Sequence, residues 1–152
     1  MKVLIGVVLA LTPHIADAGC SPDRVTVKGD FGQVNFTVEV ADTNESRAQG
    51  LMFVEEMPTL EGMLFVYETP RRATFWMQNT LIPLDMLFAD ATGLITRVHA
   101  DAVPMDRTTI DGGEAVQFVL EINGGLAERL GIAEGDALQH PAIGPDAVLP
   151  CE

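Results

Sequence analysis

The chain has 152 residues and carries 22 acidic against 9 basic side chains, which gives a formal net charge of −13. Because nucleic-acid phosphates and anionic lipid headgroups repel so acidic a protein, we expect no nucleic-acid partner and no membrane-surface role. The length fits one domain with a modest hydrophobic core.

Residues 1–18 have the layout of a secretory signal peptide. Lys2 supplies a positive start, an apolar run covers 3–11, and Ala16-Asp17-Ala18 is a small-x-small cleavage pattern. Nine apolar residues are too few to span a bilayer. We therefore expect cleavage after Ala18 and an exported protein, periplasmic or secreted, with no stable membrane insertion once the leader is gone.

Two cysteines, Cys20 and Cys151, lie near the two ends of the mature chain. In an oxidising compartment they can form one disulfide, since the ends of a compact domain often lie close together. The alternative is a lipid anchor on Cys20, because Ala18-Gly19-Cys20 resembles the end of a bacterial lipoprotein signal. Asp17 fits that pattern poorly, so we favour the disulfide.

The middle of the chain, 25–139, is predicted to be one β-rich domain, with a short N-terminal segment at 19–24 before it. Alternating polar and apolar residues over 33–40 predict a half-buried strand. Asp42-Thr43 offers cap oxygens for a short helix at 44–49 that ends at Gly50. Further strands are predicted at 62–67 and 73–77, separated by polar residues.

The second half of the domain continues the same pattern. We predict strands at 84–89 and 94–100 around a tight turn at 90–93, and another strand at 115–122. A second short helix is expected at 126–130 and a last strand at 137–139, before an irregular tail at 140–152. Seven or so strands and two short helices predict a mainly β fold, a single barrel-like or sandwich domain.

Several stretches recur in the order and spacing of a known family: 41–43, Arg47–Phe53, Glu61–Phe65, Phe75–Asp85, Phe118–Asn123 and 127–132. On these motifs the chain resembles the bacterial and archaeal domain-of-unknown-function family 192 over about 25–138. The resemblance implies a small, mostly β, barrel-like domain, often behind a signal peptide, but no activity and no catalytic residue. Ser46 stands where the family commonly has Glu, so we expect a weaker helix start there.

Established catalytic patterns are missing from the sequence, which has no GxSxG, P-loop, HExxH or CxxC motif. We therefore predict no cofactor and no metal site, and we leave open whether the protein is an enzyme. One alternative is periplasmic Cu(I) binding by methionines, since thioethers are soft ligands. The methionines are scattered singly through apolar runs, which favours core gap-filling: Met52, Met57, Met63, Met77, Met86 and Met105.

Three carboxylates, Glu61, Asp85 and Glu121, border or interrupt apolar runs. Two of them across one cleft could perform general acid–base chemistry, so a carboxylate-dependent hydrolase is a second alternative. Asp85 must either face water or be buried with a partner such as Arg47 or Arg97. Strand alternation places Asp85 on the face of Leu87 and opposite Leu84 and Met86.

The stretch 75–85 also suits a ligand site. Trp76 and Met77 offer an apolar wall, while Asn79 and Asp85 offer polar anchors, which is the usual make-up of a small-ligand pocket. Asn79 equally suits a turn. We predict a monomeric, non-enzymatic binding module for a small molecule or short peptide, with these candidate site residues: Arg47, Glu61, Trp76, Met77, Asn79, Asp85 and Glu121.

Overall fold

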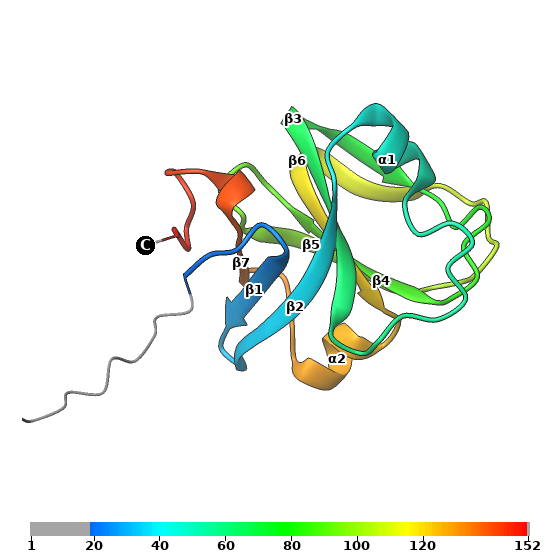
Figure 1. Cartoon of the computed structure of the whole chain (residues 1–152), viewed down its shortest axis with the longest axis horizontal. Helices are drawn as coiled ribbons and strands as arrows, with labels where there is room; N and C mark the ends of the chain where they lie inside the picture. Colours follow the sequence, from blue (N-terminus) through cyan, green and yellow to red (C-terminus); the bar gives the residue numbers. More distant parts are fainter. Residues whose placement is uncertain (1–18, 152) are drawn as a thin grey trace, which may run out of the picture.

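The structure, a computed structural model, describes residues 19–151, so the predicted signal peptide at 1–18 lies outside the described residues. Within that range the fold is mainly β, as predicted, and has the following elements (Figure 1): β1 Arg24–Gly29, β2 Gly32–Ala41, α1 Asn44–Gln49, β3 Glu61–Phe75, β4 Leu84–Ala89, β5 Ile95–Ala102, β6 Ile110–Asn123, α2 Leu126–Leu130, β7 Ala137–Gln139 and a 3₁₀ turn, η1, Pro141–Ile143.

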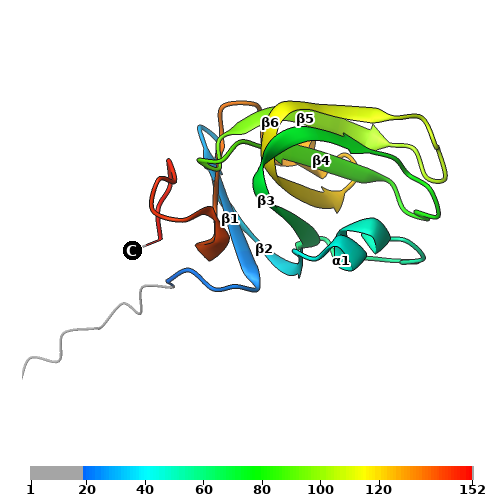
Figure 2. The same ribbon diagram turned by 90° about the horizontal axis from the view of Figure 1, so that it is seen from above.

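All seven strands belong to one sheet with the order β5-β4-β6-β3-β2-β1-β7, and only the β2/β3 pair is parallel. The sheet curls into a half-barrel (Figure 2). Its two edges meet at one end, where Leu94 bridges Ala137 and the Leu138 amide donates to the Gly93 carbonyl at 2.8 Å. These contacts satisfy backbone groups that an open sheet would leave at its edges.

Because side chains alternate along each strand, the curled sheet supports two separate hydrophobic clusters. The inner cluster draws side chains from all seven strands, for example Phe36, Leu87 and Leu120, and α2 packs against it. The outer cluster includes Phe65 and Phe88 and is partly covered by the segment after α1. Alternate residues of β4 and β6 therefore face opposite sides of the sheet.

Three strands differ from the sequence prediction, and one of them, β6, begins at Ile110 instead of 115. β1 was not predicted, and β3 runs continuously through 68–72, where we expected a break. β3 continues because it stays paired with β6 across register shifts between Val66 and Thr74. Pro70 lies in this irregular, exposed part, where a strand tolerates a residue without an amide hydrogen.

The two ends of the described chain are joined. Cys20 and Cys151 form a disulfide with their Cα atoms 5.6 Å apart. The Nδ1 atom of His140 accepts a hydrogen bond from the Ala142 amide, so Nε2 carries the hydrogen and donates to the Pro22 carbonyl at 2.9 Å. Within the described residues, no helix is long and apolar enough to cross a membrane.

The start of α1 is better capped than we predicted from Ser46. The Ser46 amide donates to the Thr43 hydroxyl at 3.0 Å, and the Thr43 amide donates to the Ser46 hydroxyl at the same distance. These bonds form a complete capping box, because a serine hydroxyl can accept the hydrogen bond that a Glu would accept. The expectation of a weak helix start was therefore wrong.

Candidate functional site

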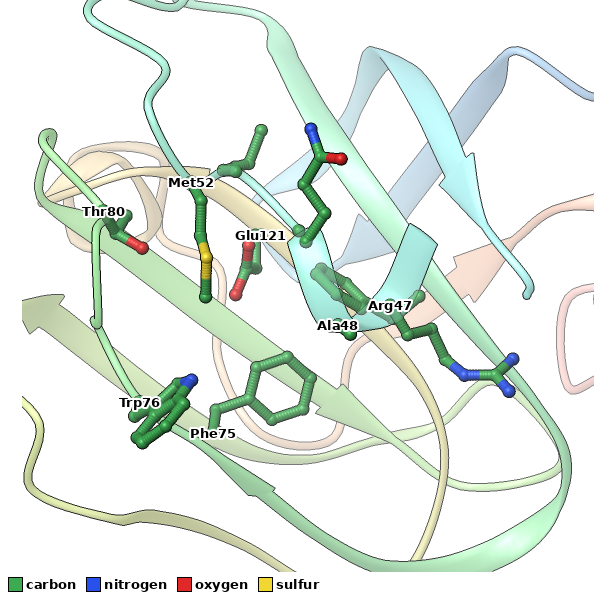
Figure 3. Close-up of a pocket in the computed structure, with 11 residues that line it drawn as sticks. Arg47, Ala48, Met52, Phe75, Trp76, Thr80 and Glu121 are labelled. Atoms are coloured by element: carbon green, nitrogen blue, oxygen red, sulfur yellow. The ribbon is translucent and has the colours of Figure 1, made fainter. Parts of the chain in front are cut away.

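A pocket opens between α1, the outer face of the sheet and the segment after β3 (Figure 3). It offers about 40 Å³ of room, enough for a few water-sized groups. Its lining residues are Arg47, Ala48, Gln49, Gly50, Leu51, Met52, Phe65, Phe75, Trp76, Thr80 and Glu121.

All eleven lining residues come from four of the stretches that carry the family resemblance. They belong to Arg47–Phe53, Glu61–Phe65, Phe75–Asp85 and Phe118–Asn123. These segments are far apart in the sequence, and the fold brings them to one place. The motifs thus signalled the pocket, although each one by itself could equally have been a packing motif.

Glu121 is the only carboxylate in the lining of this pocket. Its side chain projects into the pocket between Met52 and Phe75 (Figure 3), and the residue is only 4 % exposed. Among the described residues its carboxyl has no hydrogen-bond or ion-pair partner. Burial raises the pKa of Glu121 to about 8, so the carboxyl is mostly protonated at neutral pH.

The position of Glu121 follows from the alternation of β6. Leu120 and Ile122 belong to the inner cluster, so Glu121 points to the outer face with Val119. Its neighbours across the sheet, Met63 on β3 and Met86 on β4, are apolar and buried. No side chain next to it on the sheet can therefore compensate the carboxyl.

Gly62 allows the close approach of β3 to this strand. A Cβ atom at Gly62 would lie 2.4 Å from the backbone oxygen of Glu121, which no real contact allows. The glycine in the Glu61–Phe65 motif thus has a direct packing reason.

The apolar walls of the pocket are built from aromatic rings and a thioether. Phe75 packs edge-to-face against Phe65, with the ring centres 5.1 Å apart, and against Phe88 at 5.7 Å. Met52 closes one side, and Trp76 is 46 % exposed at the rim. The aromatic packing fixes the position of Phe75, while Trp76 keeps a surface that a ligand can cover.

Arg47, our cationic candidate, contributes to the wall but does not direct its charge into the pocket. Its guanidinium points away from Glu121 (Figure 3) and donates to the carbonyls of Asp42 and Val66, both at 2.7 Å. It also pairs with Glu68 at 3.2 Å. Arg47 therefore fastens α1 to β3, and this role positions the Ala48–Met52 side of the pocket.

Asp85 lies on the inner face of the sheet, away from this pocket, and is fully buried. Its carboxylate accepts three backbone hydrogen bonds at 2.8 Å, from the amides of Asp101, Gly125 and Ala127. Two of these amides lie at the start of α2, which has no cap from its own side chains. In place of the arginine partner we considered, Asp85 caps a helix and links it to β5.

The other candidate residues are dispersed. Met77 is buried and lines a different hollow beside His99 and Asp106, and exposed Glu61 lines another beside Met57. Asn79 adopts the left-handed conformation at φ 54°, which agrees with its interpretation as a turn residue. Of the seven candidates, the structure brings Arg47, Trp76 and Glu121 to one pocket.

This arrangement gives less support to both alternative functions, the carboxylate-dependent hydrolase and Cu(I) binding by methionines. Glu61, Asp85 and Glu121 lie in three separate environments, and Asp85 and Glu121 project from opposite faces of the sheet, so they do not form a two-carboxylate cleft. Met63, Met77 and Met86 are core residues. Among the described residues, no group of three or more His, Cys, Asp or Glu side chains is arranged to hold a metal ion.

Three loops meet beside the pocket and are hydrogen bonded to one another. The Phe53 amide donates to the Asn79 carbonyl at 2.9 Å, and the Met105 amide donates to the Thr80 carbonyl at 3.0 Å. Phe53, Asn79 and Met105 all have positive φ angles without being glycine. Such conformations are unfavourable and persist only where the surroundings hold them, so these loops form an ordered rim.

The fold and the pocket define a class: a small half-barrel domain with one buried, uncompensated carboxyl in an aromatic pocket. Residues 25–140 match the family model DUF192, described as "Uncharacterized ACR". The chain belongs to this family, which confirms the resemblance seen in its motifs.

Two solved structures are similar to the chain. A protein of unknown function from Novosphingobium aromaticivorans DSM 12444 is 46% identical, with a TM-score of 0.74, over 76% of this chain and 82% of that one. A protein from Sinorhizobium meliloti 1021, described as a candidate transcription regulator, is 38% identical, with a TM-score of 0.77, over 84% of this chain and 99% of that one. Comparison with curated proteins gave no match.

Proposed function

We propose that this protein is an exported, non-enzymatic binding module and that the Glu121 pocket is its ligand site. One observation carries the proposal: a carboxyl that is 4 % exposed and has no partner among the described residues opens into an aromatic pocket. An uncompensated buried carboxyl opposes folding, and groups that oppose folding gather at functional sites.

The size of the pocket favours one end of a ligand rather than a whole drug-sized molecule. About 40 Å³ admits a small headgroup or the tip of a side chain. The rest of a ligand would extend over the rim, where large apolar side chains are exposed on the hydrogen-bonded loops: Phe53, Trp76, Leu81 and Met105. A peptide side chain or the end of a small molecule matches this shape.

Export is the second part of the proposal. It is supported by the signal-like pattern at 1–18 and by the disulfide between Cys20 and Cys151, since disulfides persist in oxidising compartments. Mass spectrometry of the secreted or periplasmic protein should show a chain that starts at Gly19 and loses two mass units through the disulfide. A mature chain that carries a lipid on Cys20 would contradict this part.

The proposed ligand binding does not imply that this protein regulates transcription. The description of the Sinorhizobium meliloti protein as a candidate transcription regulator concerns that protein. The net charge of −13 gives this chain no electrostatic affinity for DNA, so we do not extend that role to it.

A fragment screen by protein-observed NMR tests the binding proposal. We expect hits to shift the Trp76 indole and the Met52 methyl resonances of the wild-type protein, and we expect Glu121→Gln to change which fragments bind. Glu39→Gln is the matched control, because Glu39 is exposed on the same face of the sheet and undergoes the same change from carboxyl to amide. If no fragment of any charge class shifts the pocket resonances, the proposal fails.

A further inference from the structure

The Glu121 carboxyl has no partner among the described residues, so a ligand of this pocket must supply one. The carboxyl accepts no hydrogen bond from any described residue, and its sheet neighbours Met63 and Met86 are apolar. The lining amide and hydroxyl side chains do not reach it either, since Thr80 donates to the Gln78 carbonyl at 3.2 Å. In its ionised form the carboxylate can only accept hydrogen bonds, so the partner that this form lacks is a donor.

The remaining lining favours a positively charged donor. Aromatic faces attract cations, and Phe75 and Trp76 supply two rings at the pocket. The guanidinium of Arg107 already lies 5.9 Å from the centre of the Trp76 ring, which shows a cation at this rim. The net charge of −13 raises the local concentration of cations around the whole molecule.

The positive charge of Arg47 does not occupy the pocket and does not pair with Glu121. Its guanidinium points away from Glu121 and is already bonded to two carbonyls and to Glu68. The free volume of about 40 Å³ suits an ammonium group and the carbon atoms next to it, whereas a planar guanidinium is larger.

Resting on the proposed function of this pocket, we propose that its ligand is a primary alkylammonium group. The ammonium pairs with the Glu121 carboxylate, while Met52, Phe75 and Trp76 enclose the alkyl part. The group can belong to a free amine or to a lysine side chain or N-terminus of a peptide, which share this chemistry.

Binding of the ammonium ion releases a proton. In the free protein at neutral pH the Glu121 carboxyl holds a proton, because its pKa is about 8. A charged ammonium pairs with the ionised carboxylate, so this proton passes to the solvent while the ligand keeps all of its own. Affinity must therefore rise with pH up to about 8.

The charged and titratable groups around Glu121 do not alter the expected rise of ligand affinity with pH. Burial is the cause of its raised pKa, and no neighbouring charge contributes to it. The charged and titratable groups on the elements packed against it, in the same row across the sheet or at the pocket rim are Arg47 on α1, Tyr67 and Arg71 on β3, Glu39 on β2, His99 on β5 and Arg107 beside Trp76.

Calorimetric titration with n-propylammonium chloride tests the inference in the full mature protein. We expect affinity to rise about tenfold per pH unit between pH 5.5 and 7.5, with proton release seen as a dependence on the ionisation heat of the buffer. Glu121→Gln should weaken binding at least about 30-fold, whereas Glu39→Gln should stay within about twofold. Unchanged binding by Glu121→Gln would overturn the inference.

Two further probes separate the sources of the ammonium group. Nα-acetyl-lysine N-methylamide that binds more tightly than n-propylammonium would assign the site to lysine side chains, and a short lysine-free peptide with a free N-terminus would assign it to chain ends. If neither exceeds n-propylammonium, the ligand is a free amine.

A neutral probe distinguishes failure of the inference from failure of the proposed function. Propionamide can bond to the protonated carboxyl, so its affinity should fall as pH rises through 8. If propionamide shifts Trp76 and n-propylammonium does not, the pocket is a binding site but its ligand is not an ammonium. If neither shifts pocket resonances, both proposals fail.

Discussion

Glu121 sets the pH dependence of stability at the residue scale. Its pKa is raised from 4.5 to about 8 in the folded protein, so the folded state keeps a proton that the unfolded chain loses. The contribution of Glu121 to stability is therefore fully present below about pH 4.5, and it is lost as the pH rises through 8. At pH 7 this carboxyl lowers the free energy of unfolding, relative to acidic pH, by on the order of 3 kcal/mol.

Glu121→Gln should therefore stabilise the protein at neutral pH. A neutral amide of the same shape removes the ionisation deficit, so we expect a higher urea midpoint at pH 7 and a smaller loss of stability between pH 5 and 8. The measurement is urea unfolding at several pH values, with Glu39→Gln as control. Parallel pH profiles for the wild type and Glu121→Gln would contradict the assignment of the raised pKa.

Asp85 has the opposite energetic role. Asp85→Ala leaves the buried amides of Asp101, Gly125 and Ala127 without an acceptor, so we expect destabilisation by about 3–5 kcal/mol. Chemical denaturation measures the loss, and hydrogen exchange at these three amides locates it. A loss below about 1 kcal/mol would show that another group caps α2.

At the scale of single elements, the attachment of α1 determines the shape of the pocket. The helix has only six residues, and none of them is buried as a whole residue, so it cannot be stable by itself. Arg47 supplies the attachment, with its side chain only 8% exposed and its guanidinium bonded to the Val66 carbonyl on β3.

Arg47→Met should loosen this helix while keeping most of the apolar stem. We expect a loss of about 2–3 kcal/mol, since the charged hydrogen bonds to two backbone carbonyls are lost, and faster hydrogen exchange confined to α1. Glu68→Gln is the control, because Glu68 is 73% exposed and an exposed ion pair contributes little. Equal effects of the two substitutions would contradict the role given to Arg47.

For the whole molecule, the disulfide closes almost the entire described chain into one loop. Cys20 and Cys151 are separated by 131 positions, so the cross-link restricts the unfolded state strongly. We expect reduction, or the Cys20→Ser, Cys151→Ser double substitution, to lower the free energy of unfolding by roughly 4–5 kcal/mol.

Urea unfolding with and without reductant measures this contribution, and thiol labelling confirms that both cysteines are free after reduction. The pocket lies away from the joined ends, so the Trp76 resonance of the reduced protein should remain at its native position below the unfolding transition. A midpoint that stays constant after complete reduction would show that the contacts of η1 and His140 hold the ends by themselves.

The sequence alone determined much of the fold. Alternation predicted β2, turn and cap residues predicted both helices and the hairpin before β5, and the family motifs predicted the mainly β, barrel-like domain. These signals are local, so they can be recognised without knowing which distant segments of the chain pair with one another. The sequence could not show that β3 continues through 68–72, because that depends on its pairing with β6.

The role of each candidate site residue was decided only by the tertiary structure. Asp85 and Glu121 looked alike in the sequence, each a carboxylate among apolar residues. The curl of the sheet turned Asp85 inward, toward the free amides of α2, and turned Glu121 outward, into a pocket without a partner. The cost of a buried charge depends on what lies within hydrogen-bonding distance, and only the folded chain brings those groups together.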